Sequence, residues 1–188
     1  MVKYDYFEAL DTLALYASET VKIACSENTS SKKQLEDIRA KSSQKLLSLE
    51  NSLFSDFLPP LERDSIVAYA HTLKALIDTA CEHFTLCQTC SAIRKKSDEE
   101  KLCISLVSEI KEDTAILRNL KKPKETPDIQ KFRDILHKAI QAHVSELSKI
   151  SNGAVQKSLT PIILSTGRLR ASLSHCFDSL IETMLYNI

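Results

Sequence analysis

The sequence has few of the residues that build tight turns, stacking platforms or membrane spans. Among 188 residues there are two glycines, five prolines and no tryptophan, and aromatic residues make up only 6%. So few glycines exclude a glycine-rich phosphate loop and leave little material for β-hairpins. The low aromatic content leaves no platform on which the bases of single-stranded nucleic acid stack. These shortages favour an all-helical protein.

Neither sign of charge is in excess. The 25 lysines and arginines balance the 25 aspartates and glutamates, so no overall positive field attracts nucleic acid or an anionic membrane. No stretch reaches the roughly 18 uncharged apolar residues of a membrane span. The N-terminal stretch carries acids among its apolar residues, so we expect no secretion signal. We therefore expect a cytoplasmic protein that binds no nucleic acid and does not insert into a membrane.

The six cysteines are expected to be reduced thiols, because a cytoplasmic protein rarely keeps disulfides. Three side chains, His83, Cys87 and Cys90, follow each other at spacings of four and three, which places them on one face of a helix. Thiol and imidazole groups at this spacing suit zinc. A single CxxC without a second pair is a weak zinc signal, and the alternative is that these thiols pack as small apolar groups in a core.

Apolar residues recur at spacings of three and four in six stretches, which predicts six amphipathic helices. These stretches run through residues 7–24, 35–57, 62–93, 97–117, 129–150 and 161–188. Pro59 and Pro60 must end the second helix, because proline lacks the amide donor and clashes with the preceding turn. Ser97 has the character of an N-cap, followed by three acids that suit the positive end of a helix dipole. The segment Lys121–Asp128, with two prolines and mixed charge, is the clearest linker.

The two halves of the chain share sequence features. Leu-Pro-Pro at residues 58–60 corresponds to Leu-Thr-Pro at residues 159–161, and LIDTACEHF from Leu76 aligns with CFDSLIETM from Cys176. We therefore predict an all-α fold of six long helices, arranged as two pseudo-repeated three-helix bundles. The repeats cover about residues 1–95 and 96–188 of a single domain, residues 1–188.

The stretch FLPPLERDSIVAYAHTLKALID, residues 57–78, carries the most specific pattern. Pro60 ends one helix, and Glu62 and Asp64 supply carboxylates near the first amides of the next, with Arg63 between them. The pattern resembles the PhoU-like family, in particular its branch of phosphate transport regulators. The residues that match are Phe57, Pro60, Glu62, Arg63, Asp64, Ile66, Leu73, Ile77 and Asp78.

This resemblance implies six helices in two related bundles and a non-enzymatic role. The protein would regulate inorganic phosphate transport by contact with a phosphate transporter or its regulatory protein. Members of the family carry Glu/Asp-x-x-x-Asp pairs that bind iron, zinc or another divalent ion. The corresponding positions here are Arg39 and Ser43 in one helix and Lys74 and Asp78 in the next. Three of these four carboxylates are missing, so we expect no bound cofactor.

Self-association is also expected. The apolar residues Leu15, Leu47 and Leu76 lie off the main helical stripes, so we expect them to face another subunit of a homo-oligomer.

A different class of function stays open from the residues alone. Asp78 with Glu82, and Asp178 with Glu182, each place two acids on one helix face. If the repeat brings the pairs together, four carboxylates would form a divalent metal site, for iron or zinc, with oxidative or hydrolytic chemistry. The alternative is that both pairs are solvated. A third possibility is a divergent scaffold with no phosphate role.

No catalytic set is predicted. The remaining histidines are scattered, and no serine or cysteine stands beside one of them in a nucleophile motif. These histidines are His71, His137, His143 and His175.

Overall fold

The computed structural model describes residues 4–26, 31–56, 59–89, 97–120, 126–153 and 157–187. These ranges contain six long α-helices and two short 3-10 helices: α1 (Tyr6–Ala24), α2 (Lys32–Ser55), α3 (Arg63–Thr89), α4 (Asp98–Thr114), η2 (Ala115–Asn119), α5 (Ile129–Ser151), η3 (Lys157–Leu159) and α6 (Thr160–Tyr186). No strand occurs within them. The prediction of an all-α fold with six long helices is therefore confirmed.

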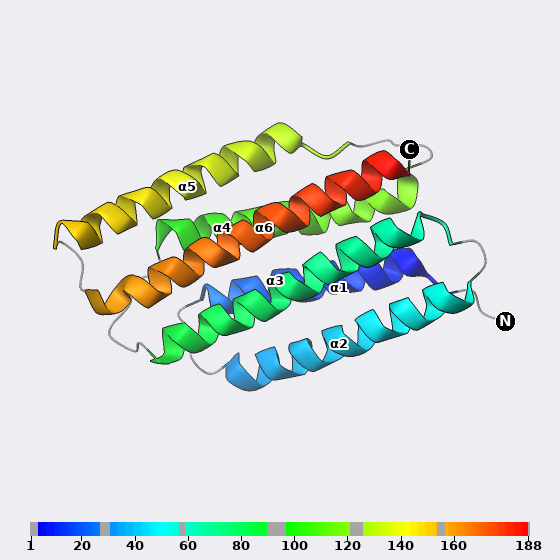
Figure 1. Cartoon of the computed structure of the whole chain (residues 1–188), viewed down its shortest axis with the longest axis horizontal. Coiled ribbons are helices and arrows are strands. Elements are labelled where there is room, and N and C mark those ends of the chain that lie inside the picture. The colour runs from blue at the N-terminus through cyan, green and yellow to red at the C-terminus, as the bar shows by residue number, and fades with distance from the viewer. Residues whose placement is uncertain are drawn as a thin grey trace.

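The helices form two sets of three. α1, α2 and α3 pack on one another, as do α4, α5 and α6, and the sets meet where α3 packs against α6 and α1 against α4. Successive helices run in opposite directions, with α2 and α5 at opposite edges and the other four between them (Figure 1). Each pairing within the first set therefore has a counterpart in the second. None of the helices in the described ranges has the length and hydrophobicity to cross a membrane.

The core lies between the four inner helices. Leu10 and Leu13 of α1, Leu73 of α3 and Leu173 of α6 are completely buried there. The outer helices bury much narrower stripes. On α5 the stacked rings of Phe132 and Phe177, with centroids 3.7 Å apart, hold the helix against α6. The outward faces of α2 and α5 therefore remain exposed.

Side-chain caps and a proline mark the starts of the helices in the second half of the chain; those at Ser97 and Pro161 were predicted, and the cap at Asp128 was not. Ser97 accepts a hydrogen bond from the amide of Glu100, whose carboxylate accepts one from the amide of Ser97, so α4 begins with a capping box. Asp128 caps α5 in a similar way through the amide of Lys131. Pro161 lies in the first turn of α6, as expected for a helix that begins near it.

The position predicted for Leu76 is wrong. Leu76 is 0% exposed, whereas Leu15 and Leu47 are 38% and 58% exposed. The physical reason is that α3 packs against α1, α2 and α6, so its buried face is wider than the single stripe that the periodicity predicts. Leu76 therefore belongs to the core and not to a surface that faces another subunit.

Leu76 and Leu47 provide a matched test of this assignment. Leu76→Ala should lower the free energy of unfolding by about 2–5 kcal/mol, because it leaves a cavity in the core. Leu47→Ala should change it by less than about 0.5 kcal/mol. Urea unfolding followed by far-ultraviolet circular dichroism measures both values, and equal losses would contradict the assignment.

Candidate functional site

The α2–α3 turn, which carries the family resemblance, ties three helix ends together. The Arg63 guanidinium donates a hydrogen bond to the backbone carbonyl of Asp56 at the end of α2. The Glu62 amide donates to Oδ1 of Asn187, which follows α6, over 2.6 Å. The Glu62 carboxylate accepts from the Ser65 hydroxyl over 3.0 Å. These residues therefore have a structural role, because their hydrogen bonds connect the ends of α2 and α6 to the start of α3.

Pro60 and Asp64 complete the description of this turn. Asp64 is exposed in the first turn of α3, where its charge suits the positive end of the helix. Pro60 lies between the end of α2 and the start of α3 and lines a surface pocket. Phe57, the other end of the motif, lies outside the described residues.

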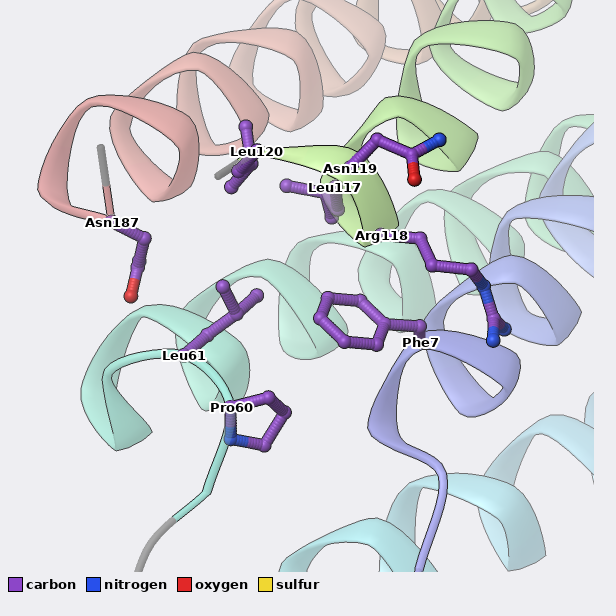
Figure 2. Close-up of a pocket in the computed structure, with 8 residues that line it drawn as sticks. All are labelled: Phe7, Pro60, Leu61, Leu117, Arg118, Asn119, Leu120 and Asn187. Atoms are coloured by element: carbon purple, nitrogen blue, oxygen red, sulfur yellow. The ribbon is translucent and has the colours of Figure 1, made fainter. Parts of the chain in front are cut away.

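That pocket, shown in Figure 2, has a volume of about 370 Å³ and is largely apolar. Arg118 is the charged residue among those that line it. Its guanidinium lies 3.1 Å from Asp5 Oδ2 and 3.7 Å from Asp11 Oδ2, and 5.6 Å from the centre of the Phe7 ring. Because two carboxylates already neutralise this cation, the pocket lacks the chemistry of a phosphate site.

Asp78 is surrounded by cations. Its Oδ1 lies 2.8 Å from Arg39 Nε, and its Oδ2 lies 2.5 Å from Lys74 Nζ. Arg39 and Lys74 occupy two of the positions where the resemblance places metal-binding acids. A salt-bridged cluster therefore stands in place of the anionic ligands that a divalent ion needs.

The other predicted acids are exposed. Glu82 lies on the surface of α3, and Asp178 and Glu182 lie on α6, where they line a surface pocket of about 380 Å³ together with Arg133 of α5. Among the described residues, one group of three His, Cys, Asp or Glu side chains has its ligand atoms within 4.8 Å of one another, and it contains none of the four predicted acids. The described structure therefore does not gather these carboxylates into a cluster.

That group lies at the end of the bundle opposite the chain termini and contains Cys25, His83 and Glu100. Glu100 is 1% exposed, and its Oε1 lies 2.8 Å from His83 Nε2. The other ring nitrogen, His83 Nδ1, lies 3.2 Å from the Ser165 hydroxyl of α6. Cys25 is buried at the end of α1. Residues from α1, α3, α4 and α6 thus meet in one buried polar cluster.

Glu99 forms a second buried site beside the first. It is 0% exposed, and its two oxygens lie 3.0 Å from Arg170 Nε and 2.8 Å from His143 Nδ1. A Cβ atom at Gly167 would lie 2.6 Å from His143 Cε1, so the imidazole lies against the backbone of α6. A side chain at position 167 would therefore force the ring of His143 or the helix to shift.

Sequence reasoning found only part of this arrangement. The spacing that places His83 and Cys87 on one face is matched by a distance of 3.5 Å between Cys87 Sγ and His83 Nε2. Cys90 lies outside the described residues. Helical spacing does not reveal the contributions of Cys25 and Glu100, because these residues lie far from His83 in the sequence and belong to other parts of the bundle. The signal that points to them is topological: in an alternating bundle, the ends of α1 and α3 and the start of α4 share one end (Figure 1).

The comparisons with known proteins leave the family open. No model of a known protein family matches the chain, and no curated protein matches it either. The PhoU-like resemblance therefore remains a prediction from the residues around the α2–α3 turn.

A double-mutant cycle tests the contact between His143 and Gly167. Gly167→Ala should destabilise the wild-type protein, because overpacking costs about 1–3 kcal/mol and the better helix propensity of alanine offsets at most about 1 kcal/mol. In a His143→Ala background the same change should stabilise by up to about 1 kcal/mol, since the clash is gone. Thermal and urea unfolding of the four proteins measure this. The same effect of Gly167→Ala in both backgrounds would show that the ring does not lie there.

Proposed function

We propose that the protein is a non-enzymatic, PhoU-like regulator of inorganic phosphate transport that acts in the cytoplasm. It works by contact with a phosphate transporter or its regulatory protein. The observation that carries this proposal is the joining of two three-helix sets through α3 and α6, with the motif of Pro60 and Glu62 at the turn into α3. This is the architecture that the resemblance implies.

The outer helices support a mechanism based on contact. Because α2 and α5 bury only narrow stripes, their outward faces are available to a partner. Large apolar side chains lie exposed there: Leu47 is 58% and Phe54 89% exposed on α2, and Val144 is 59% exposed on α5. Exposed apolar side chains of this size are typical of protein-binding surfaces. Leu47 and Leu15 also remain available for the predicted homo-oligomer.

The salt bridges of Asp78 favour this proposal over a carboxylate-bridged metalloprotein. A metal site built on Asp78 would have to break its contacts with both Arg39 and Lys74. It would then place a divalent cation beside two positive charges. Regulation through a protein surface needs no such rearrangement.

The test is phosphate uptake in the organism that encodes the protein. Deleting the gene should change the rate of radiolabelled phosphate uptake severalfold, and the wild-type gene should restore it. Leu47→Asp should fail to restore it, because a charge disrupts the apolar face of α2. Ser105→Asp, which adds the same charge at an exposed position of α4, should restore it fully.

Two results would contradict the proposal. Unchanged uptake after deletion would favour a scaffold without a phosphate role. If Leu47→Asp restores uptake as well as the wild type does, the α2 face is not the contact surface. Circular dichroism of the purified variants confirms that each of them folds.

A further inference from the structure

We propose that Cys25, His83 and Glu100 bind one zinc ion at the end of the bundle opposite the chain termini. Their ligand atoms already lie within 4.8 Å of one another, and all three side chains are buried. This inference is independent of the phosphate role, because it concerns the ion and not the partner.

The chemistry of the three groups selects the metal. Thiolate, imidazole and carboxylate are the three ligand types that zinc takes in proteins. Magnesium and calcium prefer sites made only of oxygen atoms, so a thiolate and an imidazole disfavour them. The cluster also differs from the exposed acids of α3 and α6, which offer only oxygen atoms.

His83 and Glu100 each form a second hydrogen bond, to a group that does not contact the metal. Metal ligands are usually oriented by such hydrogen bonds. With zinc on His83 Nε2, the ring proton lies on Nδ1, which donates to the Ser165 hydroxyl 3.2 Å away. Glu100 binds through Oε1, while its Oε2 keeps the hydrogen bond from the Ser97 amide over 2.9 Å. Zinc replaces the thiol proton of Cys25, which passes to solvent.

Small movements complete the coordination. Two ligands about 2.0 Å from zinc at a tetrahedral angle lie about 3.3 Å apart. His83 Nε2 and Glu100 Oε1 are now 2.8 Å apart. When zinc replaces the proton between these two atoms, they must therefore separate by about half an ångström.

Cys87 is placed to supply the fourth ligand. Nitrogen and sulfur ligands of tetrahedral zinc lie about 3.5 Å apart. Cys87 Sγ lies 3.5 Å from His83 Nε2. It also lies 4.0 Å from Nδ1, so the thiol lies beside the ring and outside the group of three ligands, and its side chain must move to reach the metal.

The ion would link the two halves of the protein. Cys25 directly follows α1 and His83 belongs to α3, whereas Glu100 belongs to α4. Zinc bound only in the folded state should therefore raise the melting temperature.

Titration of the metal-free protein with zinc chloride, in a reducing buffer without chelator, tests the site. Calorimetry should give one ion per chain with a Kd below about 1 µM. Cys25→Ala and His83→Gln should each weaken binding by at least about a hundredfold, since even the loss of a supporting group costs 10–100-fold. Ser165→Ala, which removes a supporting group, should weaken it by about tenfold. Cys87→Ser should weaken it by more than this, because Cys87 is a ligand, but by less than Cys25→Ala, because Cys87 must move to reach the ion.

Cys176→Ala is the matched control. Cys176 is also a buried thiol, and burial raises its pKa to about 12, but it is not in the group with His83 and Glu100. Its variant should bind zinc like the wild type. Cobalt supplies a direct readout through the thiolate-to-cobalt charge-transfer band. The band should appear in the wild type and in Cys176→Ala, weaken in Cys25→Ala, and be lost when Cys25 and Cys87 are both replaced.

Three results would overturn the proposal. The first is no calorimetric signal for zinc at one hundred times the expected Kd. The second is wild-type affinity in both Cys25→Ala and His83→Gln. The third is binding that survives these changes but is lost in Asp178→Asn/Glu182→Gln, which would place the ion on the exposed acids of α6.

Discussion

The packing of α3 against α6 is the constraint on which the rest of the structure depends. These are the two longest helices, and each is also covered by an inner and an outer helix of its own set. Their contact fixes which helix ends meet, and so decides that His83 of α3 lies beside Ser165 of α6. The second buried site depends on the packing of α4 and α5 on the same helix α6, where Gly167 leaves room for the ring of His143 of α5. Both buried polar sites therefore include side chains of α6.

Burying two consecutive glutamates is costly unless each carboxylate oxygen has a partner. Glu99 is matched by Arg170 and His143, and Glu100 by His83 and the Ser97 amide. Since these partners come from several helices, the same bonds set the axial register of the helices at this end. An apolar core alone tolerates sliding between helices, whereas paired buried charges do not. The network therefore favours one arrangement of the two halves.

The sequence predicted well what depends on neighbouring residues and poorly what depends on which helix ends meet. The helices follow from local periodicity, and the Ser97 capping box from four consecutive residues. The absence of acids at Arg39 and Lys74, where the PhoU-like resemblance would place metal ligands, is also visible, because it needs only the identity of each position. In contrast, the burial of Leu76 depends on how many helices cover α3. In the sequence, the acids in the first turn of α4 look like surface residues that complement the helix dipole. Only the three-dimensional packing shows that Glu99 and Glu100 are buried.

The proposed contact surface and the proposed zinc site are separated in the fold, and this limits how one can affect the other. A ligand shifts a protein only by binding one arrangement better than another. Zinc held by α1, α3 and α4 would favour one placement of the two halves, and this placement sets the distance between α2 and α5 at the opposite edges (Figure 1). A partner that touches α2 alone does not sense that distance. Zinc can therefore regulate only a partner that contacts both α2 and α5. Whether zinc binding and partner binding are coupled depends on how large a surface the partner covers.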